Sequence, residues 1–138
     1  MVDPVATGAR APERGLTYDA GALIALERAD RTTWALHAAA LRRGIRPTLP
    51  TVVLGQTWRG GPQAQLSRAV RGCRVEALDE YRARAAGTLL AAAASSDLVD
   101  AAVVIGALRR HDAVVTSDPG DLSVLADAAG RDLVLLEV

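Results

Sequence analysis

Residues 98–118, LVDAAVVIGALRRHDAVVTSD, contain the stretch that decides the fold. Its first part, residues 98–110, is an apolar run of helical length, and β-branched residues follow at 113–116 after a short polar turn. A buried helix that leads directly into a buried strand is typical of a sheet covered by helices. We therefore predict a helix over residues 98–110 and a strand over residues 113–116.

The same alternation continues in both directions along the chain. Strands that alternate with helices favour a parallel sheet covered on both faces, so we expect one α/β domain over residues 16–138, after a flexible N-terminal arm over residues 1–15. The remaining predicted strands are residues 16–19, 46–49, 73–78 and 133–136, and the remaining predicted helices are residues 20–28, 31–43, 51–59, 63–71, 79–93 and 119–129.

The composition excludes several kinds of chemistry. The 138 residues are 50% apolar, which is enough for a core in one domain. All 16 basic residues are Arg, so the chain has no lysine for a phosphate-binding loop, a Schiff base or a phosphoryl transfer that pairs Asp with Lys. The formal net charge is zero, so any contact with nucleic acid must be local.

The compartment is inferred from the cysteine content and from the absence of targeting signals. Cys73 is the single cysteine, so neither an internal disulfide nor a cysteine-based zinc site is expected. No segment has the apolar run of a signal peptide or a membrane helix. We expect a soluble cytoplasmic protein.

Three aspartates stand out as candidate site residues. Asp19 and Asp118 follow predicted strands, and ligands of open parallel sheets bind beyond the carboxyl ends of the strands. Asp100 is the only polar residue between Leu98 and Leu108, where a lone buried carboxylate would cost several kcal/mol. If these carboxylates meet, their oxygen ligands favour Mg²⁺ or Mn²⁺, ions that activate water and neutralise charge on a phosphate.

Helix capping is the alternative interpretation of two of these residues. Asp is a favoured N-cap residue, and both Asp19 and Asp118 directly precede predicted helices. The run from Asp118 to Asp121 also resembles a capping box with Pro119 at the first helical position. Both interpretations stay open at the level of sequence.

The order of three motifs resembles a known family. Tyr18-Asp19-Ala-Gly-Ala-Leu-Ile, Asp100-Ala-Ala-Val-Val and Val115-Thr116-Ser117-Asp118 are similar to motifs of the PIN-domain ribonucleases, in particular the VapC-like toxins of type II toxin–antitoxin pairs. The resemblance covers about residues 16–138. It implies a three-layer α/β/α sandwich with a mainly parallel central sheet and a carboxylate cluster that binds one or two Mg²⁺ or Mn²⁺ ions.

The resemblance also implies roles for individual residues. Asp19, Asp100 and Asp118 would be the catalytic acids and metal ligands, Thr116 would support Asp118, and Asp121 is a candidate for a further carboxylate. Asp97 is the alternative to Asp100; we prefer Asp100 because its spacing from Thr116 and Asp118 suits the motif without a gap, whereas Asp97 suits the helix dipole.

The implied function is metal-dependent endoribonuclease activity, with metal-activated water hydrolysing RNA phosphodiesters, in a homodimeric toxin covered by a small antitoxin and without a membrane. One departure affects activity: Gln56 stands where such proteins commonly carry a Glu, so metal binding would be weaker or a second ion lost. Glu27 is the nearest compensating carboxylate, or else a solvated charge. The alternative is a catalytically weakened PIN-like binding or regulatory domain.

The residues beside Gln56 suggest a possible RNA contact. Trp58 and Arg59 follow it directly, and an aromatic ring next to a guanidinium can bind RNA by stacking and by pairing with phosphate. Equally, Trp58 can belong to the core or to an interface with a partner.

Overall fold

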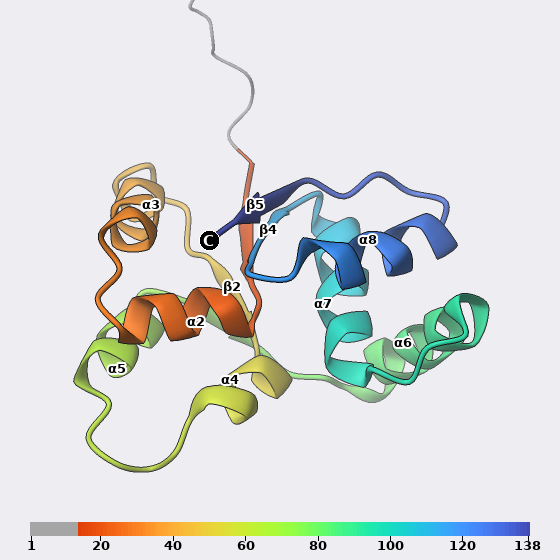
Figure 1. Ribbon diagram of the computed structural model, residues 1–138, viewed down its shortest axis with the longest axis horizontal. Coiled ribbons are helices and arrows are strands. Elements are labelled where there is room, and N and C mark those ends of the chain that lie inside the picture. Colours follow the sequence, from red (N-terminus) through yellow and green to blue (C-terminus); the bar gives the residue numbers. More distant parts are fainter. Residues whose placement is uncertain (1–13) are drawn as a thin grey trace, which may run out of the picture.

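The computed structural model describes residues 14–138, so most of the expected arm over residues 1–15 lies outside the described residues. All five strands join one parallel sheet in the order β3-β2-β1-β4-β5 (Figure 1). The elements are β1 Leu16–Tyr18, α2 Ala20–Glu27, α3 Arg31–Arg42, β2 Thr48–Pro50, α4 Thr51–Thr57, α5 Ala64–Arg71, β3 Arg74–Glu76, α6 Glu80–Ala93, α7 Leu98–Arg110, β4 Ala113–Thr116, α8 Pro119–Ala128 and β5 Leu135–Glu137.

The architecture confirms the predicted α/β class. Helices α2, α3 and α5 lie on one side of the sheet, and α6, α7 and α8 pack together on the other (Figure 1). Each connection between parallel strands therefore crosses one face of the sheet through helices, as a parallel sheet requires. The result is a three-layer α/β/α sandwich.

Two strands begin later than the sequence pattern predicts. The strand predicted at residues 46–49 is β2, Thr48–Pro50, and the one predicted at residues 133–136 is β5, Leu135–Glu137. Before β2, Pro47 offers only its carbonyl to the sheet and accepts a 2.8 Å hydrogen bond from the Arg74 amide. The apolar pattern of the sequence alone does not show where these two strands begin.

The core is aliphatic and closely packed around the central strand β1. Tyr18, Leu23, Leu49, Val104 and Val114 are fully buried at its centre. Small alanines on α2, α6 and α7 let these helices approach the sheet and one another, since alanine adds little volume at a contact.

The helices of residues 14–138 differ from membrane spans in length and apolar content. None of them alone is long and apolar enough to cross a bilayer. Only α6 and α7 taken together meet those requirements, and this pair is bent by 109°.

Candidate metal-binding site

The two central strands carry candidate acids to the same edge of the sheet. Asp19 directly follows β1 and occupies the N-cap position of α2, while Asp118 occupies the N-cap position of α8 just after β4. Because β1 and β4 are parallel neighbours, with Tyr18 opposite Val115, their carboxyl ends coincide. The Asp19 amide also donates a 3.0 Å hydrogen bond to the Val115 carbonyl, which holds the first acid against β4.

Thr116 connects these two acids. Its buried hydroxyl donates a 2.8 Å hydrogen bond to Oδ2 of Asp19 and accepts a 3.0 Å hydrogen bond from the Asp118 amide. The resemblance implied support of Asp118 alone, whereas the structure joins Thr116 to both turns. One hydroxyl therefore fixes the Asp19 carboxylate and the backbone that carries Asp118.

Capping does not account for the carboxylates of Asp19 and Asp118. Neither side chain accepts a hydrogen bond from a backbone amide of its own helix, although each occupies an N-cap position. Three other aspartates, Asp30, Asp79 and Asp97, do cap their helices, each through a backbone amide three residues later. The chain thus uses Asp as an ordinary cap elsewhere, but the two acids at the strand ends are left for another role.

Helix α7 brings two more carboxyl groups to the site. Asp97 is its N-cap and accepts a 3.0 Å hydrogen bond from the amide of Asp100, which lies half-buried in the first turn. Asp97 and Asp100, the two alternatives for the third acid, are therefore neighbours, but their side chains differ in hydrogen bonding. Asp97 caps the helix through its side chain, a hydrogen bond in addition to the dipole interaction predicted for it, while the Asp100 side chain is free of that task.

Repulsion among these acids appears in their pKa values. Burial is the main factor that raises the pKa of Asp100, from 3.8 to about 7. The pKa of Asp121 is raised chiefly by a side-chain hydrogen bond to Asp118 and by the charge of Asp118. The pKa of Asp100 is raised further by the negative charges of its neighbours, which are, from the largest effect to the smallest, Asp97, Asp19, Asp121 and Asp118.

The carboxylates of this cluster are suitable ligands for a hard divalent cation, but they do not form a preformed metal-binding site. Carboxylate oxygens are the ligands that Mg²⁺ and Mn²⁺ prefer, and a cation would relieve the repulsion that raises the pKa of Asp100. Among residues 14–138, however, no three acidic, histidine or cysteine side chains converge closely enough to form a ready metal-binding group. Binding would require these side chains to turn toward the ion.

The remaining candidates lie on or beside α4. Gln56 is exposed, and within the described part of the chain its side chain forms no hydrogen bond. The Arg59 guanidinium donates to the carbonyls of Gln56 at 2.6 Å and Trp58 at 2.9 Å, so it closes the end of the helix. Glu27 lies at the far end of α2 from Asp19 and accepts hydrogen bonds from the Gln63 amide at 3.1 and 3.2 Å.

One residue that shapes the site was not predicted from the sequence. Gly21, in the first turn of α2, packs so closely on the turn after β4 that an added Cβ would lie 2.6 Å from the Ser117 amide nitrogen. Only glycine permits this approach, which keeps the turn with Asp118 beside the turn with Asp19. The only sign of this role in the sequence is the presence of a glycine in the first turn of a predicted helix.

The fold and this acidic edge define an α/β domain with carboxylates gathered beyond the ends of its central strands. No family model matches the chain, and no curated protein sequence matches it. Among solved structures, the chain is similar to one from the crystal structure of VapBC2 from Rickettsia felis bound to a DNA fragment from its promoter. The TM-score is 0.64 at 11% identity, over 89% of this chain and 98% of that one. At this identity the likeness shows a shared fold.

Proposed function

We propose that the protein is a metal-dependent endoribonuclease, the toxin of a toxin–antitoxin pair. The observation that carries the proposal is the pair Asp19 and Asp118, which sit at adjacent strand ends, are tied together by Thr116 and do not cap their helices. The shared fold with a chain of VapBC2 supports the same conclusion. A small antitoxin and a second copy of the chain are the partners that this proposal implies.

The proposed roles follow from the positions of the residues. Asp19, Asp100 and Asp118 would hold Mg²⁺ or Mn²⁺, with Asp121 as a further ligand beside Asp118. Such an ion supplies activated water and neutralises charge on the phosphate that is attacked. Thr116 keeps the Asp19 carboxylate oriented. Asp100 is half-buried among other acids, so a nearby cation would favour its charged form.

The test is Mn²⁺-dependent cleavage of an RNA pool by the wild-type protein and by Asp100→Asn. We expect the variant to lose cleavage without a fall in the melting temperature of the metal-free protein, because the amide preserves the shape of the side chain without its charge. Asp127→Asn, at an exposed position of α8, is the matched control and should cleave like wild type. Equal cleavage by wild type and Asp100→Asn would reject the assignment.

A second candidate function is a PIN-like binding or regulatory domain with weakened catalysis. It is favoured by the neutral, exposed Gln56 and by the lack of a ready three-ligand group within residues 14–138. Gln56→Glu separates the two proposals. Cleavage that appears only in the variant would favour the weakened domain, while equal cleavage by both proteins would favour the enzyme.

A further inference from the structure

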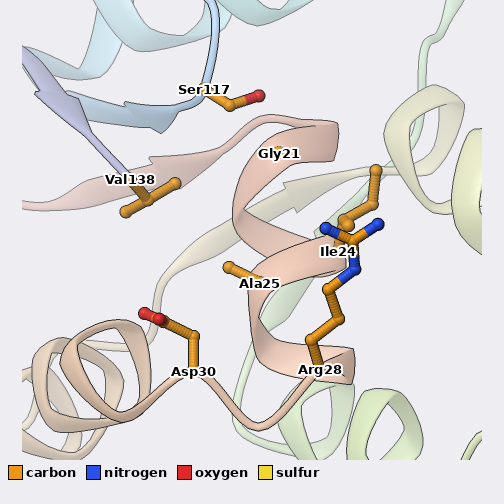
Figure 2. A pocket seen from close by; sticks show the side chains of 7 residues that line it. All are labelled: Gly21, Ile24, Ala25, Arg28, Asp30, Ser117 and Val138. Atoms are coloured by element: carbon orange, nitrogen blue, oxygen red, sulfur yellow. The ribbon is translucent and has the colours of Figure 1, made fainter.

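A groove runs along α2 from the acidic edge of the sheet. It has a volume of about 480 Å³, which lies within the range of roughly 300–1,000 Å³ that is common for ligand pockets. Figure 2 shows Ser117 and Gly21 at one end of it and Arg28 and Asp30 at the other. Since Gly21 and Ser117 are close neighbours in sequence of Asp19 and Asp118, the groove opens beside the candidate metal-binding site.

The inner wall of the groove is shallow because it consists of small residues. Gly21 and Ala25 are separated by about one helical turn of α2 and line the same groove, as Figure 2 shows. Ala25 projects only a methyl group, which leaves space beside the helix for another molecule, while Ser117 fills the space beside Gly21. On the facing side lie the Ser117 hydroxyl and the side chain of Val138.

Arg28 gives the groove a positive group that is not engaged elsewhere. Within the described part of the chain, its guanidinium forms no hydrogen bond or ion pair. By contrast, Arg59 closes α4, and Arg110 binds the carboxylates of Glu76 and Asp112. In Figure 2 the Arg28 side chain extends back along α2 to the level of Ile24, toward the end that carries Gly21.

The groove also contains a negative group, the Asp30 carboxylate, which is held in place by hydrogen bonds. Asp30 accepts hydrogen bonds from the Thr33 amide at 2.9 Å and the Thr33 hydroxyl at 2.6 Å, and these bonds hold its pKa below the usual range. Its charge is therefore present at neutral pH. A polyanion in the groove would be attracted by Arg28 and repelled by Asp30.

We propose that this groove seats the RNA strand next to the cleavage point, with Arg28 binding a backbone phosphate. The inference rests on the proposed ribonuclease function and identifies where the substrate would leave the acidic edge. Because a helix rises about 1.5 Å per residue, Arg28 lies about 13 Å along α2 from Asp19. Because the Arg28 side chain extends back along α2, the phosphate that it binds would lie closer to the scissile one than this spacing, and Arg28 would contribute to substrate binding.

The experiment measures binding of a single-stranded RNA oligonucleotide to the nuclease-deficient Asp100→Asn protein across a series of salt concentrations. Adding Arg28→Ala should weaken binding about tenfold, the loss expected for one charge-assisted hydrogen bond. It should also reduce the slope of log Kd against log salt by about 0.7, the value for one phosphate contact to a single strand. In the active protein, the same substitution should raise KM more than it lowers kcat.

Two further variants make the test specific. Arg84→Ala removes the same charge from an exposed position on α6, in the other helical layer, and should leave RNA binding unchanged. Asp30→Asn should strengthen binding, because asparagine still caps α3 while the repelling charge is lost. This opposite sign is expected if RNA occupies the groove.

The possible results separate the groove from the proposed function. If the wild-type protein cleaves RNA but Arg28→Ala binds it with the same affinity and salt slope as Arg84→Ala, the groove assignment is wrong and the ribonuclease proposal stands. If the wild-type protein neither cleaves nor binds RNA, the ribonuclease proposal fails and the groove assignment fails with it. Weaker binding by Arg28→Ala alone, with a reduced salt slope, supports the groove.

Discussion

The Thr116 hydroxyl lies between the Asp19 carboxylate, to which it donates a hydrogen bond at 2.8 Å, and the Asp118 amide, from which it accepts one at 3.0 Å. Both bonds join turns that follow neighbouring strands, so the hydroxyl fixes their relative position. A carboxylate that is already oriented needs less reordering when it binds a cation. Thr116 is therefore best understood as a positioning residue.

Thr116→Val should separate positioning from folding. Valine keeps the branched shape but leaves a nearly buried Asp19 carboxylate without its donor, which costs about 1–3 kcal/mol of stability. Loss of a supporting hydrogen bond also weakens metal affinity by about 10- to 100-fold. We expect Mn²⁺ to raise the melting temperature of the variant less than that of the wild-type protein, as measured by differential scanning fluorimetry.

The control for this prediction is Thr88→Val on α6, where the hydroxyl donates a hydrogen bond to the Arg84 carbonyl of its own helix. It should respond to Mn²⁺ like the wild-type protein. If Thr116→Val shows the same Mn²⁺ response as Thr88→Val, the hydroxyl does not orient a metal ligand.

The acidic cluster should make the metal-free protein less stable as the pH rises. Burial and neighbouring carboxylates raise the pKa of Asp100 from 3.8 to about 7. A group with a raised folded-state pKa contributes stability that is complete below its unfolded value and is lost as the pH rises through the folded value. Between about pH 4 and pH 7, the stability contributed by Asp100 should therefore decline.

Melting temperatures in chelator-containing buffers across this pH range provide the measurement. Asp100→Asn should flatten the decline, because its amide does not titrate, and Asp127→Asn should leave it unchanged. Millimolar Mn²⁺ should restore stability to the wild-type protein at the upper end of the range, since a ligand that binds the folded state stabilises it. The same decline in wild type and Asp100→Asn would show that another group is responsible.

The sequence reveals some parts of this site well and others poorly, for physical reasons. Asp19 and Asp118 could be placed because parallel strands bring their carboxyl ends to one edge, and the alternation of strands and helices is visible in the apolar pattern. Asp100 could be recognised because a lone charge in an apolar helix needs an explanation. These inferences depend on local pattern and on one general property of parallel sheets.

Other features depend on contacts between segments that are distant in the chain. The sequence does not show that Asp19 and Asp118 leave the capping amides unused, because Asp30, Asp79 and Asp97 have the same local context and do cap. The groove at Arg28 likewise requires α2 to meet Ser117 and Val138, which lie far along the chain. Both the unused capping amides and the groove are decided by packing between distant segments, which the local pattern of the sequence does not encode.

Gly21→Ala should disturb the site through packing alone. The added Cβ would lie 2.6 Å from the Ser117 amide nitrogen, so α2 and the turn before Asp118 would have to separate. Overpacking of this kind costs about 1–3 kcal/mol. We expect a lower melting temperature and a weaker response to Mn²⁺, both measured by thermal denaturation.

Gly87→Ala is the matched control for Gly21→Ala. Gly87 is exposed inside α6, and a Cβ there would meet no atom of residues 14–138 within 4 Å. Alanine should raise stability by about 0.5–1 kcal/mol, because glycine is unfavourable inside a helix. If Gly21→Ala were as stable and as responsive to Mn²⁺ as Gly87→Ala, the close approach at Ser117 would not matter.

Arg110 should be one of the residues on which folding depends most, independently of any activity. Its guanidinium bridges Glu76 at 2.8 Å and Asp112 at 2.8 Å and also donates to the Thr17 hydroxyl at 2.9 Å. Arg110→Met would leave the buried Asp112 carboxylate without its cation and would leave Glu76 only the longer contacts to Arg82 at 3.5 Å and Arg74 at 3.9 Å. The expected cost is about 3 kcal/mol, or roughly 10 °C in melting temperature.

Arg110→Lys should recover only part of this loss, because an ammonium group cannot reproduce the planar fork of the guanidinium. The exposed pair of Arg84 and Glu80, with side chains 78% and 77% exposed, offers the comparison: Arg84→Ala should change stability by less than about 0.5 kcal/mol. Urea denaturation of the three variants measures these differences. Equal stability of Arg110→Met and Arg84→Ala would mean that the carboxylates of Glu76 and Asp112 find other partners or water when the guanidinium is removed.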